Sequence, residues 1–113
     1  MQYGLAAYLE DEQTYLSLPK FYQQKRDFFL QQMNGSSLRP LGNAGTYFQL
    51  FDYSPISNEP DTEFACRMTT EFGVAAIPVS VFYTSNRDDG IIRLCFAKTE
   101  ETLEKAGALL KKI

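Results

Sequence analysis

The first third of the chain carries its apolar residues at helical spacing. They recur every three or four positions over the range Leu5–Met33. We expect helix over 2–34, with a kink or break at Pro19, because proline has no amide hydrogen to donate to the helix ladder. Gly35 is predicted to end the helix in the left-handed conformation that glycine adopts without strain.

The apolar stripe of this predicted helix is broader than packing on one sheet requires. A helix on a sheet needs about three apolar positions in two turns, and here Phe21 and Phe28 lie beside the main stripe. One interpretation is a thick core within this chain. The other is a long helix wedged between two domains, and the pattern favours neither.

After a loop over 36–45, the pattern changes to short apolar stretches between turn residues. Residues 46–53 are rich in aromatics and have apolar groups on both faces, which predicts a central, largely buried strand. The next apolar stripe is helical. Asn58 or Asp61 is expected to cap that helix, and Gly73 to end it.

The last third predicts two more strands and a helix. We expect a short strand over 74–77 that Pro78 terminates, a polar loop over 84–90, and a strand over 91–97. Thr99 is a good N-cap for the final helix. The order helix, strand, helix, strand, strand, helix predicts an α/β (α+β) two-layer sandwich, in which a small mixed sheet of about three strands packs with helices.

The composition excludes several kinds of chemistry. Without histidine, the chain has no Ser-His or Cys-His nucleophile and no histidine general base. Cys66 and Cys95 lack metal-site spacing, so we predict no metal; we interpret both as reduced core thiols of a cytosolic protein, a disulfide being the open alternative. The net charge of -3 with mixed signs predicts no nucleic-acid partner. No apolar stretch reaches about 18 residues, so we expect no membrane span.

Arg93 is the residue whose position points to binding chemistry. On the predicted strand 91–97, Ile92, Leu94 and Phe96 share one face, and Arg93 lies among small and apolar residues on the other. A guanidinium there is costly unless it meets an anion, and its planar fork matches a carboxylate. Two alternatives stay open: the side chain extends to solvent, or it pairs with an Asp or Glu of this chain.

Four stretches occur together in the order and spacing of one known family. They are Tyr22–Asp27, Gly45–Phe48, Gly73–Tyr83 and Ile92–Lys98. Together they resemble the C-terminal part of the class I/II aminotransferases of fold type I, which use pyridoxal phosphate. The most similar branch contains the methionine and the kynurenine (glutamine) aminotransferases. The resemblance covers nearly the whole chain, from about Tyr3 to Ile113.

The resemblance implies a role for the chain and for two side chains. It implies a single domain over 1–113, the small domain that closes over the substrate, with helix 2–34 linking it to a large domain and an α/β body over 46–113. It also implies that Arg93 binds the α-carboxylate of the substrate. Tyr47, which the pattern alone would assign to a plain core, is implied to line the substrate pocket.

The resemblance places the cofactor elsewhere. In this family, the large domain carries the lysine that forms the Schiff base with pyridoxal phosphate and most phosphate contacts. We therefore predict no catalytic and no cofactor-binding residue in this chain, which alone should not transaminate. The implied partners are an amino acid, such as methionine, an aromatic amino acid or glutamine, and a 2-oxo acid. A cytoplasmic homodimer is expected for the intact enzyme, and Phe82 and Tyr83 would lie in a mobile loop region near the site.

Two other functions stay open. A pyridoxal-phosphate-dependent carbon–sulfur β-lyase shares the carboxylate-binding arginine, although the stretches 73–83 and 92–98 favour the aminotransferase. A free-standing α/β ligand-binding or interaction module is the non-enzymatic alternative. The loop 84–90 differs from the family, which leaves substrate preference open.

Overall fold

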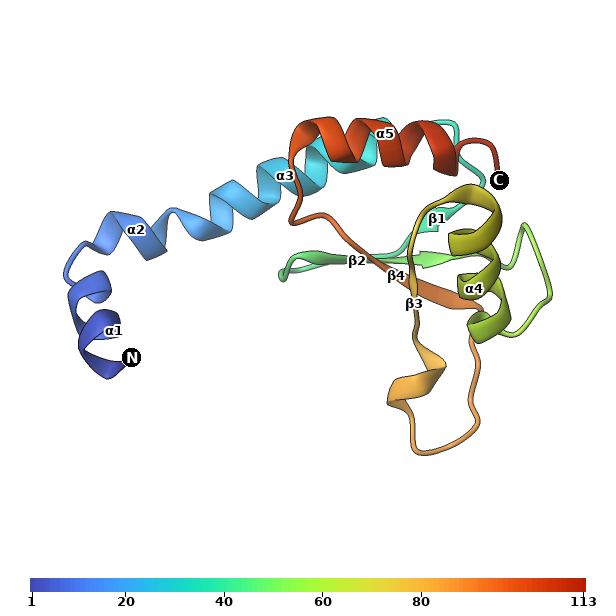
Figure 1. Cartoon of the computed structure of the whole chain (residues 1–113), viewed down its shortest axis with the longest axis horizontal. Helices are drawn as coiled ribbons and strands as arrows, with labels where there is room; N and C mark the ends of the chain where they lie inside the picture. The colour runs from blue at the N-terminus through green and yellow to red at the C-terminus, as the bar shows by residue number, and fades with distance from the viewer.

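The computed structural model describes all 113 residues, as an antiparallel sheet with helices packed on one of its faces (Figure 1). The sheet order is β1-β2-β4-β3, and each neighbouring pair is antiparallel. The two-layer α/β class is confirmed, but the sheet has four strands and is not mixed. The elements are α1 (Gln2–Leu9), α2 (Glu12–Leu16), α3 (Leu18–Gln32), β1 (Arg39–Pro40), β2 (Phe48–Asp52), α4 (Asp61–Phe72), β3 (Ile77–Pro78), the 3-10 helix η1 (Ser80–Phe82), β4 (Ile91–Cys95) and α5 (Glu100–Leu110).

The segment 2–34 forms three helices instead of one. The break expected near Pro19 is confirmed, because α2 ends just before it and Pro19 lies in the first turn of α3, where no amide donor is needed. A second break was not predicted. There, the side chain of Asp11 accepts a hydrogen bond from the Gln13 backbone N–H and begins α2 as an N-cap. Gly35 has a φ of 89°, as expected.

Helices α1 and α2 extend away from the rest of the molecule (Figure 1). Neither contains a buried residue. The radius of gyration is 16.4 Å, whereas a compact chain of this length has about 13 Å. The thick-core interpretation is therefore wrong for these helices, and most of their large apolar side chains are exposed.

The core lies between one sheet face and helices α3, α4 and α5. Phe51, Ile92 and Leu94 point from the two central strands into it. Helices α3 and α5 run side by side (Figure 1), so close that a Cβ added at Gly107 would lie 2.8 Å from the Cβ of Gln32. No α-helix covers the opposite face of the sheet, because every α-helix that contributes to the core packs on this side; only the 3-10 helix η1 reaches that face, where its Phe82 ring lies near Arg93.

Two local predictions in the second half of the chain are wrong. Helix α4 is not capped by Asn58 or Asp61: its N-cap is Pro60, and the Asp61 N–H donates at 2.8 Å to the carboxylate of Asp88, from a distant loop. The strand expected over 74–77 is also wrong in its bounds, because β3 begins only at Ile77 and includes Pro78. Proline is tolerated there because β3 lies at the sheet edge. The N-cap at Thr99 is confirmed.

The cysteines are free, but the core prediction for them is wrong. Cys66 is exposed on α4 and Cys95 is half-buried on the uncovered sheet face. No cluster of three or more Cys, Asp or Glu side chains is placed to hold a metal ion. None of the helices combines the length and the apolar character that crossing a membrane would need.

Candidate functional site

Arg93 lies in the middle of the uncovered sheet face. It is directly opposite Leu50 on β2 and Ile77 on β3. Because side chains alternate along a strand, Phe48 and Leu50 share its face, whereas its neighbour Ile92 points into the core. The predicted division of this strand into a core face and an Arg93 face is confirmed.

Two aromatic rings cover the guanidinium of Arg93. Its Cζ lies 3.9 Å from the ring centroid of Phe48 and 4.9 Å from that of Phe82. Cations favour such positions over aromatic rings. The side chain is half-buried, so it does not extend freely into solvent.

Arg93 has no anionic partner in this chain. Its buried Nε–H has no acceptor, and its two terminal nitrogens stay accessible and unbonded. A buried N–H without an acceptor costs about 1–3 kcal/mol. The alternative of an internal Asp or Glu partner is therefore wrong. The basic residues that do form ion pairs are Arg26, Arg67, Arg87 and Lys105.

Tyr47 is separated from Arg93 by Phe48. The ring of Tyr47 lies 4.3 Å from that of Phe48 and 6.1 Å from that of Tyr22 on α3. Tyr47 is 45% exposed, so it is not a core residue of this chain. The structure thus links Tyr47 to Arg93 through one intervening ring and does not place the two in direct contact.

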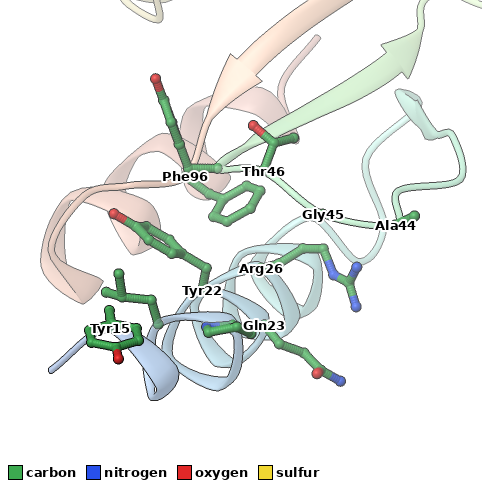
Figure 2. A pocket seen from close by; sticks show the side chains of 11 residues that line it. Tyr15, Tyr22, Gln23, Arg26, Ala44, Gly45, Thr46 and Phe96 are labelled. Carbon is green, nitrogen blue, oxygen red and sulfur yellow. The ribbon is translucent and has the colours of Figure 1, made fainter. Parts of the chain in front are cut away.

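Tyr47 lines a cleft of about 730 Å³ between the helices and the start of β2. Figure 2 shows how side chains of α3 face the loop that leads into this strand. Three of the lining residues are tyrosines, which can contact apolar and polar groups alike. The cleft is lined by Tyr15, Leu18, Pro19, Tyr22, Gln23, Arg26, Ala44, Gly45, Thr46, Tyr47 and Phe96.

The loop before β2 is held by Asn43. Its side-chain amide donates to the Phe48 carbonyl at 2.8 Å, and its side-chain oxygen accepts from the Gly45 N–H at 2.9 Å. Arg26 donates to the Asn43 carbonyl at 2.9 Å. Thr46 has a φ of 69°, which a β-branched residue rarely adopts. Such strain persists where surrounding bonds fix the backbone, and here they fix the start of the strand that carries Phe48.

The η1 segment is held by Asp61, a residue whose role sequence reasoning missed. Ser80 donates to this carboxylate twice, from its backbone N–H at 2.7 Å and from its hydroxyl at 2.6 Å. Asp61 is 1% exposed. No local pattern distinguishes this aspartate from an N-cap, since both begin a helix.

The pKa of Tyr53 is raised well above its ordinary value. Burial is the main cause, followed by the negative charges of Asp88, Asp61 and Glu59. The hydroxyl donates at 2.6 Å to the Glu59 carbonyl. Tyr53 therefore stays protonated and has a structural role in the core.

The fold and the site define an α/β domain whose α-helices pack on one face of the sheet, with an arginine that has no anionic partner on the other face. The sequence model of the family Aminotransferase class I and II matches residues 1–110. The chain therefore belongs to the class I and II aminotransferase family, and the resemblance is confirmed.

The relatives agree with this assignment. Methionine aminotransferase of Escherichia coli (strain K12) is 48% identical over 113 residues, covering 99% of this chain and 29% of the relative. Kynurenine–oxoglutarate transaminase 1 of Mus musculus is 36% identical over 104 residues, covering 80% of this chain and 24% of the relative. The chain thus spans less than a third of the length of these relatives.

Solved structures show the same fold. An Escherichia coli protein with a methionine aminotransferase function superposes with a TM-score of 0.90 at 47% identity, covering 96% of this chain and 29% of that one. N-Succinyldiaminopimelate aminotransferase of Mycobacterium tuberculosis superposes with a TM-score of 0.86 at 28% identity, covering 98% and 29%. In both cases the chain superposes on less than a third of the solved structure.

The lysines of this chain do not fit the pyridoxal phosphate that the family implies. A Schiff-base lysine is typically desolvated near its cofactor. Lys25 is half-buried, but its amine donates at 2.8 Å to the Lys98 carbonyl. The other lysines are exposed.

Proposed function

We propose that this chain is the C-terminal small domain of a pyridoxal-phosphate-dependent amino-acid aminotransferase, and that Arg93 binds the substrate α-carboxylate. One observation carries the proposal. The guanidinium is half-buried close to two aromatic rings, and no carboxylate of the chain pairs with it. An α-carboxylate would supply the missing charge through two parallel hydrogen bonds. Holding it at a fixed point orients the Cα of any amino acid for reaction.

The rest of the enzyme would supply the cofactor and part of the pocket. Pyridoxal phosphate, when bound, provides the electron sink for amino transfer. Tyr47 would line the pocket for the substrate side chain, and its exposed ring suits methionine, aromatic amino acids or glutamine. A 2-oxo acid would accept the amino group, and Arg93 would bind its carboxylate in the same way.

The exposed apolar helices support a larger assembly. We infer that residues 1–113 form one domain, in which the segment 2–34 links to a large domain and 46–113 is the body. We further propose a cytoplasmic homodimer for the intact enzyme. Apolar patches of this kind mark surfaces that other protein covers. The exposed apolar residues on α1 to α3 include Tyr3, Leu5, Tyr8, Leu9, Leu16, Leu18 and Phe21.

A chimaera tests this function directly. This chain would replace the matching C-terminal part of Escherichia coli methionine aminotransferase, to which it is 48% identical. We expect amino transfer from methionine to a 2-oxo acid, and we expect Arg93→Ala to raise the KM for methionine without loss of cofactor absorbance. Losing a buried charged contact costs about 2–5 kcal/mol, so kcat/KM should fall by about 30-fold or more.

Two further variants sharpen the chimaera experiment. Arg93→Lys should recover only part of the lost activity, because an ammonium cannot form the planar two-bond pair. Arg87→Ala is the matched control: Arg87 is an exposed arginine that pairs with Asp89. It should leave the KM unchanged. An unchanged KM in Arg93→Ala would refute the role of Arg93.

A further inference from the structure

We propose that Asp61 and Ser80 are positioning residues that fasten η1, so that Phe82 closes an aromatic clamp on Arg93. The aromatic clamp is defined as the rings of Phe48 and Phe82, which both lie close to the guanidinium. The inference rests on the proposed function, because it assumes that Arg93 binds a carboxylate. Asp61 and Ser80 would act through Phe82 and would not touch the substrate themselves.

The clamp restricts how an anion reaches Arg93. The rings of Phe48 and Phe82 lie 3.9 Å and 4.9 Å from the guanidinium carbon. A guanidinium donates only in its own plane. The two rings occupy space next to the guanidinium carbon, whereas the terminal nitrogens have no hydrogen-bond partner and stay open to an anion. An edge approach in the plane is the geometry of the paired carboxylate bond.

The two walls of the clamp are held in different ways. Phe48 belongs to β2, which pairs along its whole length with β4. Phe82 belongs to η1, a three-residue 3-10 helix without a buried residue, and its side chain is 60% exposed. Apolar packing within this chain therefore does not hold Phe82. Its position depends on the polar bonds at the start of η1.

Those polar bonds converge on one buried carboxylate. Both oxygens of Asp61 accept from Ser80, at 2.7 Å from the N–H and at 2.6 Å from the hydroxyl. No Lys or Arg forms an ion pair with Asp61. A buried carboxylate without a cation is costly unless hydrogen bonds stabilise it. Asp88 in turn accepts from the Asp61 N–H at 2.8 Å, which fixes the start of α4.

The clamp geometry can be measured on the 113-residue chain by NMR. The Arg93 guanidinium lies close to two rings, so ring currents should shift the resonance of its Nε–H proton away from that of free arginine. Phe82→Leu should move that resonance towards the free-arginine value. Asp61→Asn should move it in the same direction by a smaller amount. Ser80→Ala should have the smallest effect, because the backbone N–H of Ser80 still reaches Asp61.

Two controls separate the clamp from general loosening of the fold. Phe82→Tyr keeps an aromatic ring and should preserve the Arg93 resonance. Asp89→Asn removes an exposed carboxylate of the neighbouring loop that pairs only with Arg87, and it should leave the resonance in place. An Arg93 resonance that is unchanged in both Phe82→Leu and Asp61→Asn would overturn the inference.

Kinetics of the chimaera test what the clamp does. Phe82→Leu and Asp61→Asn should each raise the KM for methionine about 3- to 10-fold with kcat little changed. The loss of a cation–π contact that is partly exposed to water has an effect of about this size. Phe82→Tyr, which keeps an aromatic ring, should have the same KM for methionine as the unsubstituted chimaera. If Arg93→Ala raises the KM and these variants do not, the clamp is refuted and the proposed function stands. If Arg93→Ala has no effect, the proposed function itself fails.

Discussion

The contact between α3 and α5 makes a quantitative prediction at Gly107. Replacing a helical glycine with alanine ordinarily stabilises a protein by about 1 kcal/mol. At this position the new Cβ would lie 2.8 Å from the Gln32 Cβ, 3.0 Å from the Gln32 carbonyl oxygen and 3.2 Å from its carbonyl carbon. Backbone atoms cannot rotate away, so the helices must separate. Overpacking of this kind costs about 1–3 kcal/mol, and with two backbone contacts we expect the upper part of that range.

The net expectation for Gly107→Ala is a loss of about 1–2 kcal/mol, after subtraction of the gain in helix propensity. Thermal unfolding followed by circular dichroism should show a Tm lower by about 4–8 °C per kcal/mol. Gly4→Ala is the matched control, because Gly4 is also helical and nothing lies within 4 Å of its added Cβ. An unchanged or raised Tm in Gly107→Ala would show that the two helices do not pack this closely.

Two predictions concern pH. Because the pKa of Tyr53 is raised in the folded protein, its contribution to the free energy of unfolding is complete below about pH 10, the ordinary pKa of tyrosine. That contribution is lost as the pH rises towards the folded-state pKa. Tyr53→Phe should therefore lower the free energy of unfolding by about 1 kcal/mol at pH 7 and weaken its alkaline decline, in urea titrations at pH 7 and 11. The pKa of Glu59 is lowered, mainly by the hydrogen bond from the Ser57 hydroxyl and next by the one from Arg67. The stabilisation that its carboxylate provides is therefore lost as the pH falls. Glu59→Gln should flatten the decline of stability in acid, and an unchanged acid profile would contradict this.

Local patterns predicted what depends on near neighbours in the chain. Alternation along 91–97 assigned Arg93 to the face opposite Ile92, and the register confirms it. Left-handed glycine and N-cap rules located Gly35 and Thr99. These features require only the conformation of a few consecutive residues, so the sequence specifies them without knowledge of the rest of the fold.

Contacts between distant segments were not predictable by the same rules. Strand β1 has only two residues, one of them a proline. It is a strand only because it pairs with Phe51 and Asp52 of β2. The N–H of Asp61 is satisfied by a carboxylate 27 positions later. The aromatic clamp joins residues from three separate elements. Such contacts are set by how the elements pack, and no periodicity in the sequence records them.

The open face of the sheet explains why carboxylate binding and domain closure belong together in the proposed function. Only 16 of the 113 residues are buried, and Phe82 remains 60% exposed beside Arg93. An ion pair in contact with water contributes about 0–1 kcal/mol, whereas a charged contact shielded from water is worth several times more. The chain alone should therefore bind a carboxylate weakly. Covering this face with the rest of the enzyme would remove water from the edge of the guanidinium, so the same event that buries the exposed apolar surface would also strengthen the bond to the substrate.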